Sequence, residues 1–138
     1  MDVSDYSPMT FAFMGDCVYD LLVRRRVIME ANRPAKDLHS ICSEMVCCKG
    51  QVKAFKKVVN YLTEEELNVF TRGRNAKVKH IPKHATPAEY HIATGFESIF
   101  GYLYLKGDME RIQWLFEIIF SEGVLTYDDE CETEIEGT

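Results

Sequence analysis

The sequence predicts a single all-α domain, and three observations support this prediction. The chain has 138 residues, the usual length of one domain, and 46% of them are hydrophobic, enough for one core. Signals that start helices recur along the chain. Apolar residues follow the three-to-four spacing of helices rather than the alternation of strands. We expect the helical domain over residues 1–125, followed by an acidic, disordered tail over residues 126–138.

The first half of the chain is expected to form three helices. Ser7 can cap a helix that has Pro8 in its first turn and runs over residues 8–30. A break at residues 32–34 then starts a second helix, which Gly50 is expected to separate from a third. The apolar side of the first helix is predicted to contain Phe13, Val18, Leu21 and Leu22.

Two capping boxes organise the second half of the chain. A threonine followed three residues later by a glutamate occurs at residues 63 and 86. The first box opens a short helix to about residue 71, and the second opens a helix that Gly107 ends. The basic segment between them, residues 72–85, is expected to be a loop. Asp108 can cap a last helix that reaches Gly123.

Composition narrows the environment and the partners of the chain. Its apolar stretches are all shorter than the roughly 18 to 20 residues that cross a bilayer. The five cysteines are an odd number and three of them cluster, unlike a secreted disulfide framework, so we expect reduced thiols and a cytoplasmic protein. The net charge of −6 comes from the six acids of residues 126–138, whereas residues 49–83 carry nine bases. Such local charge is what a phosphate backbone would meet.

Two acidic residues stand inside otherwise apolar helices. Asp16 follows Gly15, and both residue types are unfavourable in a helix interior. Glu97 lies in an apolar run between Gly95 and Gly101, where it is expected to be paired, to bind a metal or to mark a narrow polar stripe. Helices crossing at these glycines could bring both acids to one Mg²⁺ ion, which takes one or two protein carboxylates. The alternative for Asp16 is an exposed acid beside a glycine that serves packing.

Three motifs in a fixed order resemble a known family. GDCVYDLLVR begins at Gly15, RGRNAK at Arg72 and TGFESIFGYLYL at Thr94. Together they resemble Mini-ribonuclease III, the stand-alone ribonuclease III domains that lack a double-stranded-RNA-binding domain. The resemblance runs from about Met9 to Gly123. It implies a helical bundle like the ribonuclease III endonuclease domain, a homodimer, and Mg²⁺-dependent cleavage of double-stranded RNA.

The resemblance also implies roles for single residues. Asp16 and Glu97 match the two acids of the family motifs, so both are expected to be catalytic and to bind Mg²⁺. Further acids of full-length members are replaced here by Met9, Ala12 and Thr94. This leaves two carboxylates per subunit, and it leaves open whether the site holds one metal ion or two.

RNA contact is expected from the basic loop, because no separate RNA-binding domain accompanies the matched residues. Duplex RNA is recognised through phosphates and 2′-hydroxyls, which suits a basic loop, although a merely solvated loop is the alternative. Lys49, Gln51 and Lys53 are weaker candidates on an adjacent helix. The residues expected to bind RNA are Arg72, Arg74, Asn75, Lys77, Lys79, Lys83 and His84.

The family's usual substrate implies a role in maturing precursor 23S ribosomal RNA, with a large-subunit ribosomal protein as a further partner. A two-fold dimer suits this substrate, because it presents one site to each strand of a duplex. The competing hypothesis is a non-catalytic RNA-binding or ribosome-assembly factor built on a degenerate ribonuclease III domain. Retention of both Asp16 and Glu97 favours the enzyme.

Overall fold

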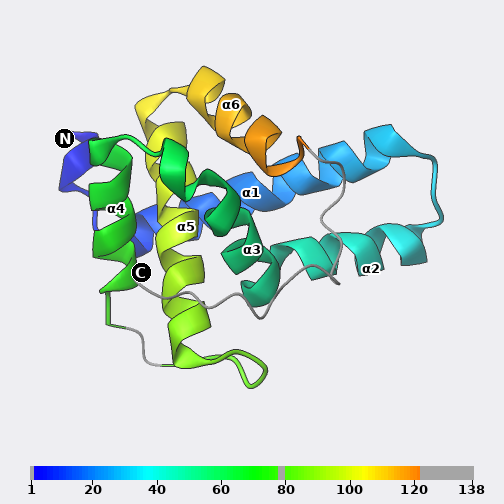
Figure 1. Cartoon of the computed structure of the whole chain (residues 1–138), viewed down its shortest axis with the longest axis horizontal. Coiled ribbons are helices and arrows are strands. Elements are labelled where there is room, and N and C mark those ends of the chain that lie inside the picture. The colour runs from blue at the N-terminus through cyan, green and yellow to red at the C-terminus, as the bar shows by residue number, and fades with distance from the viewer. Residues whose placement is uncertain (1, 78–79, 122–138) are drawn as a thin grey trace.

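The computed structural model describes residues 2–77 and 80–121 and confirms the all-helical fold (Figure 1). Within these ranges there is no strand, and two 3-10 turns, Val3–Asp5 and Val59–Tyr61, accompany the helices. The tail predicted over residues 126–138 lies outside the described residues, as does Gly123. The helices are α1 (Pro8–Glu30), α2 (Ala35–Val46), α3 (Cys48–Val58), α4 (Glu64–Arg74), α5 (Pro87–Lys106) and α6 (Met109–Ile119).

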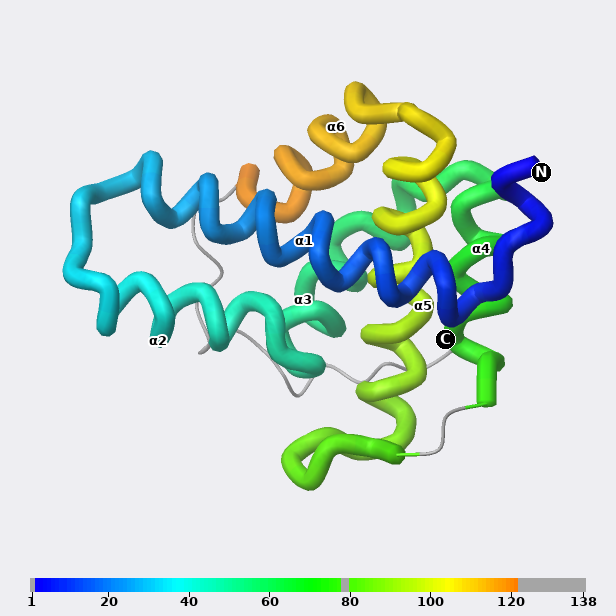
Figure 2. The backbone as a smooth tube through the Cα atoms, turned by 180° about the vertical axis from the view of Figure 1, so that it is seen from behind, coloured from blue at the N-terminus to red at the C-terminus, as the bar shows by residue number. Residues whose placement is uncertain are grey.

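Helix α5 is the centre of the bundle. Helices α1, α3, α4 and α6 all pack against it. Figures 1 and 2 show α1 crossing α5 near its middle, while α2 folds back beside α1. Any group on the crossing faces of α1 and α5 is therefore held by backbone packed on several sides.

The predicted caps explain where the helices begin. Ser7 Oγ accepts from Thr10 N at 3.2 Å at the start of α1. Thr63 and Thr86 form complete capping boxes at the starts of α4 and α5. At the other end of α5, Gly107 has φ +85°, the left-handed conformation that glycine adopts without strain. Each side-chain cap contributes about 1 kcal/mol to stability.

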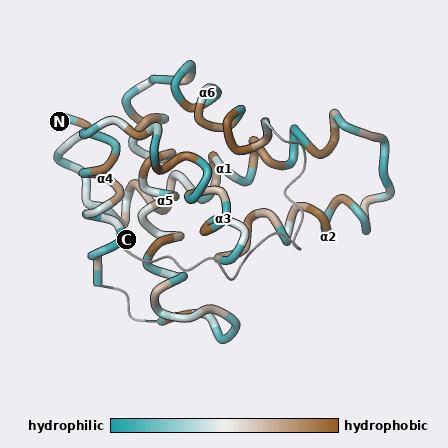
Figure 3. Tube along the Cα trace, in the orientation of Figure 1, coloured by the Kyte–Doolittle hydropathy of each residue, from teal (hydrophilic) through white to brown (hydrophobic). Residues whose placement is uncertain are grey.

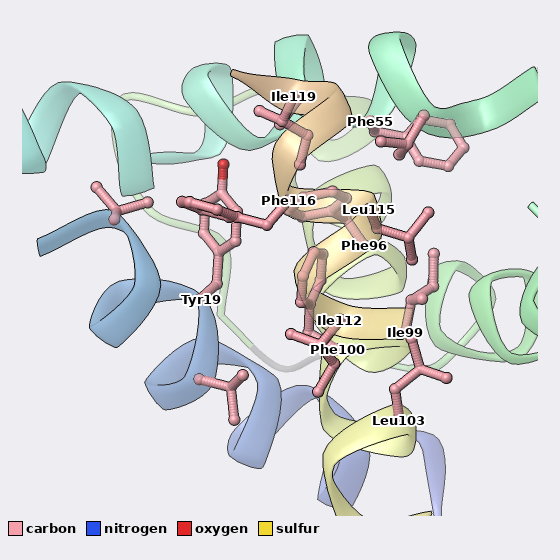
Figure 4. Close-up of a cluster of buried hydrophobic side chains, with 14 of the residues drawn as sticks. Tyr19, Phe55, Phe96, Ile99, Phe100, Leu103, Ile112, Leu115, Phe116 and Ile119 are labelled. Atoms are coloured by element: carbon pink, nitrogen blue, oxygen red, sulfur yellow. The ribbon is translucent and has the colours of Figure 1, made fainter. Parts of the chain in front are cut away.

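The core lies where α5 meets α1 and α6 (Figure 4). Tyr19 of α1 is fully buried, and its ring meets those of Phe96, Phe100 and Phe116 at centroid distances of 5.0, 5.4 and 6.1 Å. A second layer stacks Phe55 of α3 on Phe70 of α4 at 4.2 Å. Figure 3 shows that the segment between α4 and α5 is mostly hydrophilic, in contrast to the inner side of α6.

The predicted apolar side of α1 is wrong for two of its four residues. Phe13 is 82% exposed and Leu21 is 67% exposed, whereas Val18 is buried and Leu22 partly buried. Phe13 and Val18 are five residues apart, which places them about 140° apart around a helix. The side that packs on the core instead contains Phe11, Gly15, Val18, Tyr19, Val23 and Val27.

Three helix boundaries also differ from the prediction. The break between α2 and α3 is at Cys47 rather than at Gly50. Gly50 lies in the first turn of α3, where a Cβ atom would overlap the backbone carbonyl oxygens of Glu44 and Met45 near the end of α2. Helix α4 continues past residue 71 to Arg74, because Gly73 lets its last turn approach α5 closely. Helix α6 ends at Ile119, before the predicted end.

None of the helices in the described ranges is both long enough and apolar enough to cross a membrane.

Candidate active site at a helix crossing

The crossing of α1 and α5 depends on two glycines that face each other's backbone. A Cβ atom on Gly15 would overlap the carbonyl oxygen of Glu97, and one on Gly101 would overlap the carbonyl oxygen of Phe11. The predicted glycine-mediated crossing is thus confirmed. Gly95 has a similar role toward α4, because a Cβ atom on Gly95 would overlap the ring and the carbonyl oxygen of Phe70.

This crossing brings Asp16 and Glu97 together. Asp16 is exposed and Glu97 is half-buried, and their side chains share a hydrogen bond. The pKa of Glu97 is raised to about 8. Burial is the largest cause, the hydrogen bond and negative charge of Asp16 also raise the pKa, and a hydrogen bond from Gln51 lowers it. The two carboxyl groups therefore hold a proton between them near neutral pH.

The charge and chemistry of this pair suit a divalent cation. Among the described residues, no lysine or arginine contributes to the pKa shift of Glu97, so the two acids face each other without a basic partner. Nor do the described residues contain a cluster of three or more His, Cys, Asp and Glu side chains arranged for a metal ion. Two carboxylates with waters completing the shell are a usual Mg²⁺ site, and a cation would relieve the repulsion between them.

The positions at which full-length members carry further acids have other tasks here. Ala12 is buried in the helix packing, and Met9 is 41% exposed. Thr94 is buried, and its hydroxyl donates to the carbonyl oxygen of Tyr90 at 2.9 Å. The described protein thus contributes two carboxylates to the site.

Gln51 belongs to this site, and the sequence reasoning missed it. It was expected as a weak RNA contact on a basic helix face, but only 3% of it is exposed, so it cannot serve on an open surface. The available signal was its spacing from Phe55 and Val58, which places it on the apolar side of α3. Cys48, one turn earlier, is close enough for the charge of Glu97 to raise its thiol pKa, although burial is the larger cause.

The structure separates the expected RNA-binding residues into two groups. Arg72 and Arg74 belong to the last turn of α4 rather than to a loop. Arg72 donates to the carbonyl oxygen of Tyr6 at 3.5 Å, and the Arg74 guanidinium lies 5.6 Å from the ring centroid of Phe70. The exposed residues that follow are Asn75, Lys77, Lys83 and His84, whereas Lys79 lies outside the described residues.

The basic residues and the acidic pair are linked through α5. The segment that carries Lys77 and Lys83 leads into the N-terminal end of α5 (Figure 1). Glu97 is ten residues beyond Pro87, the first residue of that helix, or about 15 Å along its axis. The basic segment thus precedes α5, whereas Glu97 lies near the middle of that helix.

Comparison with known proteins assigns the chain to a family. The family described as the ribonuclease III domain matches residues 10–108, which include both acids and RGRNAK. A Mini-ribonuclease 3 from a Thermoanaerobacter species is 39% identical over 84% of this chain and 82% of its own. The Mini-ribonuclease 3 of Symbiobacterium thermophilum is 42% identical over 76% of this chain and 81% of its own.

A solved structure has the same fold. The crystal structure of protein FN1578 from Fusobacterium nucleatum superposes with a TM-score of 0.79 and is 30% identical in sequence. The match covers 88% of this chain and 97% of that one. The family match and the two relatives agree, and the chain belongs to the ribonuclease III family, in its Mini-ribonuclease 3 group.

Proposed function

We propose that this protein is an endoribonuclease that cleaves double-stranded RNA with Mg²⁺, and that Asp16 and Glu97 are its catalytic, metal-binding residues. Ribonuclease III enzymes depend on a divalent metal ion. The observation that carries the proposal is the convergence of the two acids, with the pKa of Glu97 raised to about 8 and no basic partner among the described residues. A divalent ion bound there would activate water and stabilise the charge that develops on the phosphodiester.

The two acids have different tasks in this proposal. Asp16 is exposed on α1 and can present its carboxylate to an incoming substrate and cation. Glu97 is held on α5 at the glycine crossing, where its backbone cannot shift without moving α1. The proton that the pair holds must leave before both carboxylates can bind a cation, so cation binding releases a proton.

The homodimer expected from the resemblance has a suitable surface on α1. Phe13, Leu21 and Ile28 are 82%, 67% and 57% exposed, and their spacing places them within one third of the helix circumference. Clustered exposed apolar side chains usually mark an interface. Phe13 is three residues before Asp16, so a two-fold contact along this face would hold two active sites near each other, one for each strand of a duplex.

We further propose that the substrate is a stem of precursor 23S ribosomal RNA, processed in the cytoplasm with a large-subunit ribosomal protein as a partner. The motif resemblance supports this substrate. Exposed Lys77 and Lys83 supply positive charge in the segment that leads into α5, the helix that carries Glu97. Contacts to phosphates and 2′-hydroxyls there would place the duplex along α5.

Conservative substitution of the two acids tests the proposal. Asp16→Asn and Glu97→Gln keep the side-chain shape and remove the charge that holds the cation, so each should abolish cleavage of a long RNA duplex in Mg²⁺ while RNA binding persists. Asp20→Asn is the matched control, because Asp20 is one turn after Asp16 and pairs with Arg24 at 3.1 Å. Wild-type cleavage that survives a chelator, or cleavage by both acid variants, would overturn the assignment. Absence of cleavage by the wild-type protein would favour the non-catalytic RNA-binding factor.

A further inference from the structure

Gln51 is a buried polar side chain that helix packing alone does not explain. It lies on α3, one of the helices packed on α5, and only 3% of it is exposed. A buried amide is costly unless its donors and acceptors are paired. The neighbours that it meets therefore indicate what it does.

The amide has one orientation that satisfies its neighbours. Its Nε2 donates to the carbonyl oxygen of Val46 at 3.1 Å, and the side chain also hydrogen-bonds to the Glu97 carboxyl group and favours its charged form. A backbone carbonyl and a carboxylate can only accept, so both bonds use the two N–H groups of Nε2. The amide oxygen of Gln51 takes part in neither of these two hydrogen bonds.

That oxygen, Oε1, is buried and has no hydrogen-bond partner among the residues that the structure describes. It belongs to the amide that contacts Glu97, beside a site that offers two carboxylates and no third acid among the described residues. Amide oxygens are ligands for hard divalent cations, and they also accept hydrogen bonds from the waters that such cations keep. The buried Gln51 amide thus offers a donor to Glu97 and a free acceptor on one immobile group. A residue that orients metal ligands has these two features.

We propose that Gln51 is a positioning residue of the metal site: its amide nitrogen holds the Glu97 carboxylate in place, and its free oxygen accepts from a divalent cation's water shell. This inference rests on the proposed function, because it takes Asp16 and Glu97 as the metal ligands. It explains how a site with two carboxylates keeps a defined geometry. The alternative is a purely structural tie between α3 and the end of α2, through Val46.

Metal binding without RNA tests this role directly. Gln51→Met removes both polar atoms and keeps an unbranched side chain of similar length. Gln113→Met is the matched control, because Gln113 is exposed on α6 and its amide bonds only Glu117 among the described contacts, at 3.0 Å. Binding of Mn²⁺ to the RNA-free protein would be measured by calorimetry, together with the Mg²⁺ concentration that gives half-maximal cleavage and the melting temperature in chelator.

The expected result is selective for the metal. Gln51→Met should weaken Mn²⁺ binding and raise the half-maximal Mg²⁺ concentration by about tenfold or more, the usual effect of losing a residue that orients a ligand. Cleavage should recover at high Mg²⁺, and Gln113→Met should match the wild type. Unchanged metal affinity in a folded Gln51→Met protein would overturn the inference and leave the structural tie. No metal binding by the wild-type protein would instead overturn the proposed function.

A second variant covers the case in which Gln51→Met does not fold. Gln51→Glu keeps the size and an acceptor oxygen but replaces the donor with a third acid beside Glu97. At pH 9, where the acids are charged, it should change Mn²⁺ affinity at least about threefold in either direction, because Glu97 loses its donor while a further carboxylate is placed beside the cation. Wild-type Mn²⁺ affinity in this variant at pH 9 would place residue 51 outside the metal site and overturn the inference.

Discussion

The acidic pair and the basic segment of this protein are held in opposite ways. Asp16 and Glu97 are on helices whose backbones touch at Gly15 and Gly101, so that not even a methyl group fits between them. Lys77 and Lys83 extend from an exposed connection between α4 and α5. The difference follows from what each group must do. A cation site requires fixed ligand geometry, whereas attraction of a phosphate backbone requires only charge within reach.

The largest effect is expected from filling the glycine contact. Gly15→Ala places a methyl group where the Glu97 carbonyl oxygen lies, so the helices must separate. Stability should fall by about 3 kcal/mol and cleavage should be lost, because overpacking costs about 1–3 kcal/mol and the methyl group here would meet rigid backbone atoms. In an open helix the same change would stabilise by about 1 kcal/mol. The sign of the change in unfolding free energy, measured by urea denaturation, therefore decides whether the helix crossing has room for a methyl group at residue 15.

Gly107→Ala is the control for this experiment. No atom of the described residues lies within 4 Å of a Cβ at Gly107, so within that part of the chain its φ of +85° is what opposes a side chain. The cost should be about 1 kcal/mol, and cleavage should persist. Equal stability of the Gly15 and Gly107 variants would mean that the helix crossing tolerates separation and does not hold the acidic pair rigidly.

The same contrast explains how far the sequence predicts the structure. Caps such as Ser7 and the two capping boxes are local, so they placed the starts of α1, α4 and α5 correctly. The glycine–acid pairs were also informative, because each breaks a helix preference that only close packing can offset. The site residues themselves were inferred from this anomaly and from the family resemblance.

What the sequence does not predict depends on contacts between distant segments. Apolar residues occupy both sides of α1, so periodicity alone could not tell that Phe13 faces outward. Gln51 looked like part of a polar helix face until α3 packed on α5 and buried it. The end of α4 was placed too early because Gly73 reads as a helix breaker, although it serves contact with Gly95 and Ser98 of α5.

A smaller effect is expected from the proton held by the acidic pair. The folded pKa of Glu97, about 8, is above its ordinary value of 4.5, so the folded state binds this proton more tightly than the unfolded chain. The resulting stability is fully present below pH 4.5 and is lost as the pH rises through 8. Between pH 6 and pH 8.5 the metal-free protein should lose about 2 kcal/mol, less than the full shift implies, since Glu97 is partly solvated.

Thermal unfolding in chelator measures this loss, and Glu97→Gln is the reference. That variant cannot titrate at residue 97, so its melting temperature should change less over the same pH interval. Addition of Mg²⁺ should restore the wild-type stability above pH 8, because the cation binds the charged pair. A wild-type protein that became more stable between pH 6 and pH 8.5 in chelator would contradict the sign of the shift.

The basic segment should affect binding without affecting the fold. Replacing Lys77 and Lys83 with alanine removes two exposed charges, and if both contact phosphates the slope of log affinity against log salt should fall by nearly two units, taking the duplex DNA value. Arg25→Ala with Lys36→Ala removes two exposed charges from α1 and α2 instead and should leave the slope unchanged. Fluorescence anisotropy of a labelled duplex, with the catalytically inactive Glu97→Gln protein, provides the measurement. Equal slopes in the two double variants would make the segment a solvated loop.

The smallest effect is expected from the acidic end of the chain. Residues 126–138 carry six acids and no base, and without them the acids and bases of the chain balance. Removing them should therefore lessen repulsion between the protein and the RNA phosphates and raise duplex affinity a few-fold at low salt. Near 1 M salt, where the screening length is about 3 Å, the two proteins should bind alike. The melting temperature should be unchanged, since removal of residues 126–138 leaves every described residue in place. Superimposable affinities at low salt would show that this charge does not act on the RNA, and the assignment of the acidic pair would not depend on that outcome.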